Sequence, residues 1–224
     1  MCGIAGVWDP VADATLSDMT AALAHRGPDA EGVFRSPGGG LLGHRRLSIV
    51  DLAGGDQPIL AGDGTRAVVA NGEIYNAPTL RPALAARHTF ATRSDTEVAL
   101  HLYDEHGAGF VEHLDGMYAI AIADGPDLVL ARDPVGVKPL YYTPDGDCWL
   151  FASELKAFPP GTGGVREFPP GTVFSSAQGF ATFYSVPDPE PAPAGEGTHA
   201  ARVRAALEAA VTKRLMSDVP VGAF

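Results

Sequence analysis

Cysteine, positive charge and long apolar runs are all scarce in this sequence. Only two of its 224 residues are cysteines, Cys2 and Cys148. That number is too small for a disulfide scaffold and favours a reducing compartment, the cytoplasm. Lysine and arginine total 16 against 27 aspartates and glutamates, giving a net charge of −11. This charge argues against nucleic acid and anionic membranes as partners.

The apolar segments are short as well. None approaches the roughly 20 residues of a membrane-spanning helix, so no membrane partner is expected. A secretory signal is not expected either, because the start has no basic region and Asp9-Pro10 ends the first apolar run. Hydrophobic residues make up 46% of the chain, which is ordinary for a globular core.

Apolar periodicity predicts a mixture of strands and helices. Many strands with few helices between them indicate antiparallel sheets in an α+β fold. The expected strands cover 4–8, 41–44, 67–70, 114–123, 128–131, 140–142, 148–152, 173–174 and 182–184. The expected helices cover 15–25, 79–86, 96–106 and 198–216.

Cys2 is the first candidate for chemistry. It becomes the amino-terminal residue if Met1 is removed, which its small side chain favours. A free α-amine, with an ordinary pKa of about 7.7–8.0, could then accept the thiol proton and return it to a leaving group. The alternative is that Cys2 is an ordinary small residue near the start of the chain, with no catalytic role. Cys148, inside an apolar strand, is interpreted as a core residue.

Two adjacent arginines, Arg45 and Arg46, lie in an otherwise apolar stretch. An unpaired buried cation is costly, so one of them is expected to point into a polar pocket. Its guanidinium could clamp a substrate carboxylate, or it could form a structural ion pair. The neighbouring His44 is interpreted as a core histidine.

Asn71-Gly72 follows an apolar run. An Asn-Gly pair at the end of a strand favours positive φ and a tight turn. The same pair could form an oxyanion hole from the Asn71 amide and the Gly72 N–H, with glycine allowing close approach. Further on, Ser94 or Asp95 could cap the following helix. A carboxylate there could instead face a substrate ammonium.

The loop formed by Arg26, Gly27, Pro28 and Asp29 breaks the first expected helix. It either only stops the helix or also braces the site, and the sequence leaves both possibilities open. Beyond residue 186 the composition changes. Residues 186–197 form a proline-rich acidic linker.

The helix expected after the linker carries an apolar stripe. Its members recur every four residues and are Val203, Leu207, Val211 and Leu215. We expect Thr198 to cap this helix, and residues from about 187 to 224 to be loosely docked on the preceding domain or disordered. The stripe would then be free to bind a separate polypeptide or another copy of the chain.

Many short motifs occur in one order along residues 2 to about 185. They are MCGI at Met1, RGPD at Arg26, RLSIVD at Arg46, NGEIYN at Asn71, SDTE at Ser94, DGMYAIAI at Asp115, ARDPVGVKPLYY at Ala131 and ASELKA at Ala152. Together they resemble the glutaminase domain of glutamine-hydrolysing asparagine synthetases. That domain is a class II glutamine amidotransferase and an N-terminal nucleophile hydrolase.

The resemblance implies a four-layer αββα sandwich of two antiparallel sheets and L-glutamine as substrate. It makes Cys2 the nucleophile and assigns the oxyanion to Asn71 and Gly72. The substrate-binding residues it implies are Arg46, Leu47, Ser48, Ile49, Val50, Asn71, Gly72, Glu73 and Asp95. Arg46 would hold the α-carboxylate, Glu73 and Asp95 the α-ammonium.

The resemblance also implies a domain plan. Residues 2–185 would form the glutaminase domain and 198–224 the start of an ATP-pyrophosphatase synthetase domain, with the chain ending before the pyrophosphate loop. ATP and Mg²⁺ belong to that synthetase domain, while the glutaminase half needs neither cofactor nor metal. The ammonia would amidate aspartate. Alternatively, the chain is a stand-alone glutaminase serving a separate synthetase chain and another acceptor, an amidase for other amides, or a non-catalytic module. Homodimerisation is compatible with the sequence.

Overall fold

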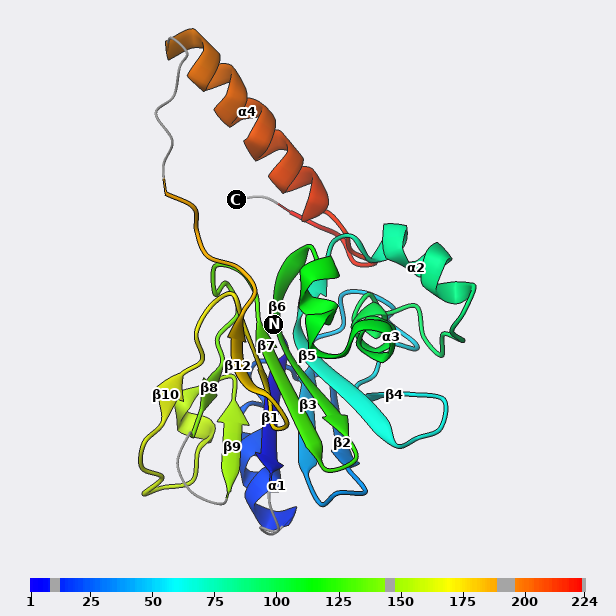
Figure 1. Ribbon diagram of the computed structural model, residues 1–224, viewed down its shortest axis with the longest axis vertical. Coiled ribbons are helices and arrows are strands. Elements are labelled where there is room, and N and C mark those ends of the chain that lie inside the picture. The colour runs from blue at the N-terminus through cyan, green and yellow to red at the C-terminus, as the bar shows by residue number, and fades with distance from the viewer. Residues whose placement is uncertain (9–12, 144–147, 189–195, 223–224) are drawn as a thin grey trace.

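A computed structural model describes residues 1–8, 13–143, 148–188 and 196–222, and its strands form two antiparallel six-stranded sheets (Figure 1). The first sheet has the order β10-β8-β9-β1-β3-β2, and the second β12-β11-β7-β6-β5-β4. The first contains β1 (Gly3–Trp8), β2 (Ala30–Arg35), β3 (Leu41–Arg46), β8 (Tyr141–Tyr142), β9 (Trp149–Ala152) and β10 (Arg166–Glu167). The second contains β4 (Ile59–Leu60), β5 (Arg66–Ile74), β6 (Gly116–Asp124), β7 (Asp127–Arg132), β11 (Thr172–Ser175) and β12 (Gly179–Thr182).

Helices cover the outer faces of the two sheets. The α-helices are α1 (Asp13–Ala22), α2 (Ala77–Ala85), α3 (Glu97–His106) and α4 (Glu196–Lys213), and the 3₁₀ helices are η1 (Gly107–His113) and η2 (Leu155–Ala157). Helix α1 packs on the first sheet, while α2, α3 and η1 pack on the second.

The order of layers follows from side-chain alternation along the strands. In β1, Ile4 packs between the sheets, whereas Ala5 and Val7 face α1. In β5, Val69 packs between the sheets, whereas Val68 faces the helices on the other side. The layers are therefore α, β, β and α. This confirms the expected antiparallel sandwich.

Two local predictions were wrong because tertiary contacts override short-range signals. Asn71 and Gly72 do not form a turn: both lie inside β5, paired with Ala119 and Tyr118 of β6. Neither Ser94 nor Asp95 caps α3, which begins at Glu97 after Thr96 and has no side-chain cap. The carboxylate of Asp95 accepts instead the N–H of Ile74 in β5, at 2.6 Å.

The C-terminal segment differs in part from expectation. Helix α4 begins at Glu196, so Thr198 lies inside it, and the helix extends away from the sheets (Figure 1). The four stripe residues Val203, Leu207, Val211 and Leu215 are 51–67% exposed, as expected for an undocked helix. The segment after the helix, however, contacts the sandwich. Lys213 pairs with Asp115, and the N–H of Asp218 donates to the Ile49 carbonyl oxygen at 2.9 Å. Lys213 and Asp218 therefore hold this part of the described segment to the sandwich, contrary to that part of the prediction.

Most of the linker expected at 186–197 lies outside the described residues. Among the described residues, the helices are too short or too polar to span a bilayer.

Candidate active site

Cys2 lies at the start of β1, where the two sheets and the loop after β3 meet. Its Sγ is 3.4 Å from the N–H of Leu47, which donates to it. Arg26 fixes the backbone here: its Nε donates to the Cys2 carbonyl oxygen at 2.8 Å, and its Nη1 donates to Glu154 at 2.8 Å. The loop containing Arg26 therefore braces the site as well as ending the first helix.

Asp29 braces a second wall of the site. Its N–H donates to the carbonyl oxygen of Arg46 at 3.0 Å, and its Oδ2 accepts the N–H of Ser48 at 2.8 Å. The Ser48 N–H is therefore engaged outside the pocket. Of the residues expected to bind substrate, Ser48 is the one that does not line the pocket in the described structure.

The edge of β5 forms the opposite wall. Strand β4 pairs only with Ala67 and Val68 of β5. Beyond these two residues, side chains accept hydrogen bonds from backbone N–H groups along this edge of β5. Gln57 Oε1 accepts the N–H of Ala70 at 2.6 Å, and Asp95 Oδ2 accepts the N–H of Ile74. Backbone direction alternates along a strand, so the N–H of Gly72 points to this same edge, between the other two. It faces the pocket.

The side chain of Asn71 is buried beside this N–H. Both ends of its amide are satisfied when the nitrogen donates to the Cys2 carbonyl oxygen at 3.1 Å and the oxygen accepts from Nη2 of Arg26 at 3.2 Å. An amide nitrogen carries two hydrogens, so the second remains for another acceptor.

Gly72 is not part of the expected turn, because its φ is not positive. A Cβ at this position would lie 2.3 Å from the Met117 carbonyl oxygen and 2.7 Å from Tyr118 Cα. Close approach of β6 therefore excludes a side chain here. Close approach of a substrate to the same glycine stays a prediction.

Arg46 is buried and holds the loop that follows β3. Its Nη1 donates to Asp56 at 2.7 Å and to the Leu52 carbonyl oxygen at 3.3 Å, and its Nη2 donates to the carbonyl oxygens of Val50 and Asp51 at 3.1 and 2.6 Å. The structural ion pair considered for this segment is therefore present. Arg46 nevertheless lines the pocket too.

Arg45 does not share this position. It pairs with Glu31 at 3.1 Å on the neighbouring strand β2. Asp56 has a side chain that is 70% exposed, so an incoming carboxylate could replace it at the guanidinium of Arg46.

Two carboxylates face the same cavity. Burial raises the pKa of Asp95, although N–H donors including that of Ile74 oppose this shift. Burial, followed by repulsion from Asp95, raises the pKa of Glu73. Adjacent like charges in a partly desolvated pocket favour binding of a cation between them.

Lys138 also lines the pocket, and the sequence analysis gave it no role. Its backbone is fixed by Asp133, whose Oδ2 accepts the Lys138 N–H at 3.0 Å, and by Arg132, whose Nε donates to the Lys138 carbonyl oxygen at 2.7 Å. Burial lowers the pKa of Lys138, and Glu73 partly offsets this. The available signal was a lysine inside the apolar run Val135–Leu140.

These groups enclose a cavity of about 130 Å³. Its lining includes the predicted residues Cys2, Arg46, Leu47, Ile49, Val50, Asn71, Gly72, Glu73 and Asp95, together with Met1, Gly55, Gln57, Ser94, Thr96 and Lys138. His44 lies outside this lining. It is buried, bonds to the Ala70 carbonyl oxygen at 3.2 Å, and burial lowers its pKa to about 4. It is a neutral core residue, as expected. Cys148 packs beside the α1 side of the first sheet, and neither cysteine forms a disulfide among the described residues.

Residues 1–181 match the sequence profile of a family described as "Glutamine amidotransferase domain". The chain belongs to the glutamine amidotransferase family. Several curated relatives cover 99% of it. They include asparagine synthetase [glutamine-hydrolyzing] of Triphysaria versicolor at 42% identity and asparagine synthetase [glutamine-hydrolyzing] 2 of Arabidopsis thaliana at 41%. A probable asparagine synthetase [glutamine-hydrolyzing] of Dictyostelium discoideum is 39% identical.

The chain spans only 39–42% of the length of these relatives. A solved structure with a similar fold is the glutamine phosphoribosylpyrophosphate amidotransferase from B. subtilis, complexed with ADP and GMP. It is 27% identical with a TM-score of 0.68, over 80% of this chain and 48% of that one.

In this amidotransferase domain the thiol is not activated by its surroundings alone. Burial raises the pKa of Cys2, while the Leu47 N–H and nearby positive charge oppose the shift. Because the thiolate is the reactive form, a base must take the thiol proton. Burial also lowers the pKa of the Met1 α-amine, the amine at the chain start while Met1 is in place.

Proposed function

We propose that this domain hydrolyses L-glutamine to glutamate and ammonia through a thioester on Cys2. The observation that carries the proposal is the position of Cys2 Sγ in one small pocket with the Gly72 N–H, the Arg46 guanidinium and the carboxylates of Glu73 and Asp95. This set matches glutamine, which has a side-chain amide, an α-carboxylate and an α-ammonium.

In the first step Sγ attacks the side-chain amide carbon of glutamine. The thiol proton passes to the α-amine of Cys2, which is free once Met1 is removed. The Gly72 N–H and the second Asn71 amide hydrogen donate to the oxyanion. Collapse of the tetrahedral intermediate breaks the C–N bond, and the amine returns its proton to the nitrogen that leaves as ammonia.

In the second step water attacks the thioester carbon. The same amine takes a proton from the water and returns it to the sulfur, so glutamate leaves and the thiol is regenerated. Arg46 holds the α-carboxylate in place of Asp56, and Glu73 with Asp95 holds the α-ammonium. The chemistry at Cys2 requires neither ATP nor a metal ion.

We further propose that the ammonia is used to amidate aspartate, in keeping with the names of the relatives. ATP and Mg²⁺ would act there in a synthetase portion, either in the same polypeptide or in a partner chain. Residues 198–222 would belong to that portion, and residues 2–185 to the glutaminase domain. We place the protein in the cytoplasm, where a nucleophilic thiol stays reduced.

A glutaminase assay on matched variants tests the proposal. Cys2→Ala should abolish glutamate release, while Cys148→Ala should retain nearly full activity. Acid-quenched protein incubated with ¹⁴C-glutamine should carry a hydroxylamine-labile label that Cys2→Ala lacks. Substantial turnover by Cys2→Ala would overturn the assignment of the nucleophile.

Two further outcomes test the base and the substrate. Full activity in protein that retains Met1, as shown by intact mass, would exclude the α-amine as base. Equal turnover of asparagine or simple acyl amides would exclude selection of glutamine by the charged groups.

A further inference from the structure

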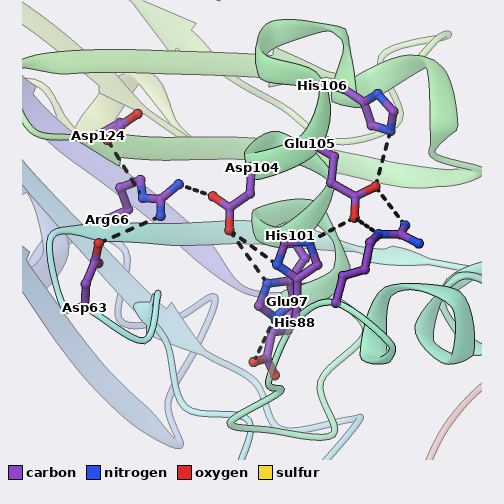
Figure 2. Close-up of polar contacts among 10 residues, drawn as sticks. Asp63, Arg66, His88, Glu97, His101, Asp104, Glu105, His106 and Asp124 are labelled. Atoms are coloured by element: carbon purple, nitrogen blue, oxygen red, sulfur yellow. Dashed lines mark hydrogen bonds and ion pairs between the residues drawn. The ribbon is translucent and has the colours of Figure 1, made fainter.

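A second polar cluster lies away from the glutamine pocket, on the side of α3 that faces the loop after α2. His88 comes from that loop, and His101 and Asp104 are one turn apart on α3. Figure 2 shows the two imidazole rings one against the other with the Asp104 carboxylate at their edge. The ring centroids are 4.7 Å apart and the rings are inclined by 29°.

The Nδ1 atoms of His88 and His101 face the same oxygen, Oδ2 of Asp104. Asp104 Oδ2 lies 3.8 Å from His88 Nδ1 and 3.9 Å from His101 Nδ1. These distances are too long for hydrogen bonds. One nitrogen from each histidine and one carboxylate oxygen lie within 4.8 Å of one another.

The opposite nitrogens face other carboxylates. His88 Nε2 is 2.9 Å from Glu105 Oε1, and His101 Nε2 is 3.5 Å from Glu97 Oε1. A proton on each Nε2 would be attracted to its carboxylate, which leaves the Nδ1 lone pairs directed at Asp104. Metal-bound histidines have this arrangement, in which the second nitrogen donates to a carboxylate that fixes the tautomer.

His101 provides an independent indication. Its side chain is only 7% exposed, yet neither of its ring nitrogens makes a hydrogen bond among the described residues. A buried polar group without a partner is costly. The unpartnered Nδ1 is directed toward the space between His88 and Asp104.

The local charge also favours a cation. Five carboxylates lie in this network, against the two guanidiniums of Arg66 and Arg87, which leaves an excess of three negative charges. The carboxylates are those of Asp63, Glu97, Asp104, Glu105 and Asp124. Arg66 contacts the other oxygen of Asp104, so Oδ2 stays directed at the histidines. His88 and Asp104 are about 17–18% exposed, which gives an ion a route in and room for a water ligand.

We propose that His88, His101 and Asp104 bind one divalent transition-metal ion through Nδ1, Nδ1 and Oδ2. Nitrogen and carboxylate ligands suit Zn²⁺, and bonds of about 2.0–2.2 Å to tetrahedral zinc place two ligands roughly 3.3–3.5 Å apart. The two nitrogen–oxygen separations of 3.8 and 3.9 Å need to close by about half an ångström, and the two nitrogens, within 4.8 Å of each other, by at most about 1.5 Å. The ion would fasten the loop after α2 to α3, the helix whose amino-terminal end follows the pocket residues Asp95 and Thr96.

Zinc binding to the intact chain in a Cys2→Ala background tests this site, because a terminal cysteine could itself bind zinc. Metal-free protein is titrated with Zn²⁺ against a chromophoric chelator. One ion per chain is expected. Loss of an outer carboxylate partner typically lowers metal affinity about 10–100-fold, so Glu105→Gln should fall in that range and His88→Ala should lose at least about 100-fold. The matched control is His113→Ala, which disrupts another stacked histidine pair, with His106 at 4.1 Å.

A second readout does not depend on affinity. Co²⁺ should give visible absorption bands in the parent that Asp104→Asn lacks, and Zn²⁺ should raise the melting temperature of the parent but not of Asp104→Asn. Circular dichroism before metal addition shows whether each variant is folded. Absence of stoichiometric zinc in the parent overturns the proposal. So does equal zinc affinity in His88→Ala and His113→Ala.

Discussion

Asp218 joins the C-terminal segment to the substrate loop at two points. Its Oδ2 accepts the N–H of Asp51 at 2.7 Å, and its own N–H donates to the carbonyl oxygen of Ile49. Asp51 in turn has a positive φ of 52°, which is unusual for a residue other than glycine. The contact therefore stabilises a strained loop whose neighbours Ile49 and Val50 line the glutamine pocket.

Removing the Asp218 side chain should loosen that loop. We expect Asp218→Ala to raise the glutamine KM several-fold with kcat almost unchanged, because in the proposed function the loop would contact substrate and it does not carry Cys2. The control is Glu208→Ala, an exposed residue on α4. Steady-state glutaminase kinetics measure the effect, and identical KM values in the two variants would show that the contact does not influence the pocket.

The C-terminal segment should behave as two parts in hydrogen exchange. Amides of α4 should exchange far faster than those of Ala119–Ala123, because the apolar face of the helix is exposed and isolated helices of this length are marginal in water. The N–H groups of Asp51 and Asp218 should be protected in comparison with α4. Protection of α4 equal to that of the core strand, in dilute monomeric protein, would show that the helix docks on its own domain.

The two roles of Arg46 can be separated by substitution. Arg46→Ala should raise the glutamine KM by orders of magnitude, since leaving a charged partner unpaired in a buried site costs roughly 2–5 kcal/mol. Asp56→Asn removes only the exposed partner. It should leave KM unchanged or lower it, because the substrate carboxylate takes that position. A KM that stays within about threefold in Arg46→Ala, well below the tenfold change of 1.4 kcal/mol, excludes the clamp.

The Asp95 carboxylate should make glutamine binding pH-dependent. Its pKa and that of Glu73 are raised in the folded protein, and the substrate ammonium requires the ionised forms. KM should therefore increase on acidification at a higher pH than ordinary carboxylates would give. Asp95→Asn keeps an acceptor for the Ile74 N–H but loses the charge, so kcat/KM should fall about 10–100-fold, in line with 1.5–3 kcal/mol for a charged hydrogen bond.

The stability of the folded protein should respond to Asp95→Asn in the opposite direction from kcat/KM. A raised pKa means that the folded protein binds this proton more tightly than the unfolded chain. The resulting penalty on folding is complete above the folded pKa, shrinks as the pH falls below it, and is gone below the unfolded pKa. Asp95→Asn should therefore be at least as stable as the parent at pH 7, with the difference narrowing on acidification. Asp18→Asn, on the exposed face of α1, is the control for both measurements. A large loss of stability in Asp95→Asn at pH 7 contradicts this reasoning.

Substitution of Gly72 tests how closely β5 packs against β6, with no change of charge. Gly72→Ala would place a Cβ against the backbone of β6, and such overpacking typically costs about 1–3 kcal/mol. For a domain of this size each kcal/mol lowers the melting temperature by about 2–4 °C. The control is Gly62→Ala, where a Cβ would have no heavy atom within 4 Å. Equal melting temperatures in the two variants would disprove the close approach.

The sequence by itself determined that the sheets are antiparallel, and the resemblance carried by its motifs implied the sandwich and most of the pocket. Short alternating apolar runs specify strands through a period of two, so β1, β3 and β6 were expected at nearly their observed positions and β5 only over its first half. The motifs that contain Cys2, Arg46, Asn71 and Asp95 were readable because each combines polar groups with an apolar strand end.

Only the tertiary structure decided what each polar group contacts. Asn71-Gly72 looks like a turn locally, but pairing with β6 keeps both residues in β5. Asp95 looks like a helix cap, but the unpaired edge of β5 supplies a closer donor at Ile74. Lys138 lies in the pocket, and His88 lies beside His101 and Asp104, because distant segments of the chain pack together. Local periodicity does not predict such contacts. Contacts between residues distant in the chain depend on how the layers pack, and that information is not contained in any short stretch of sequence.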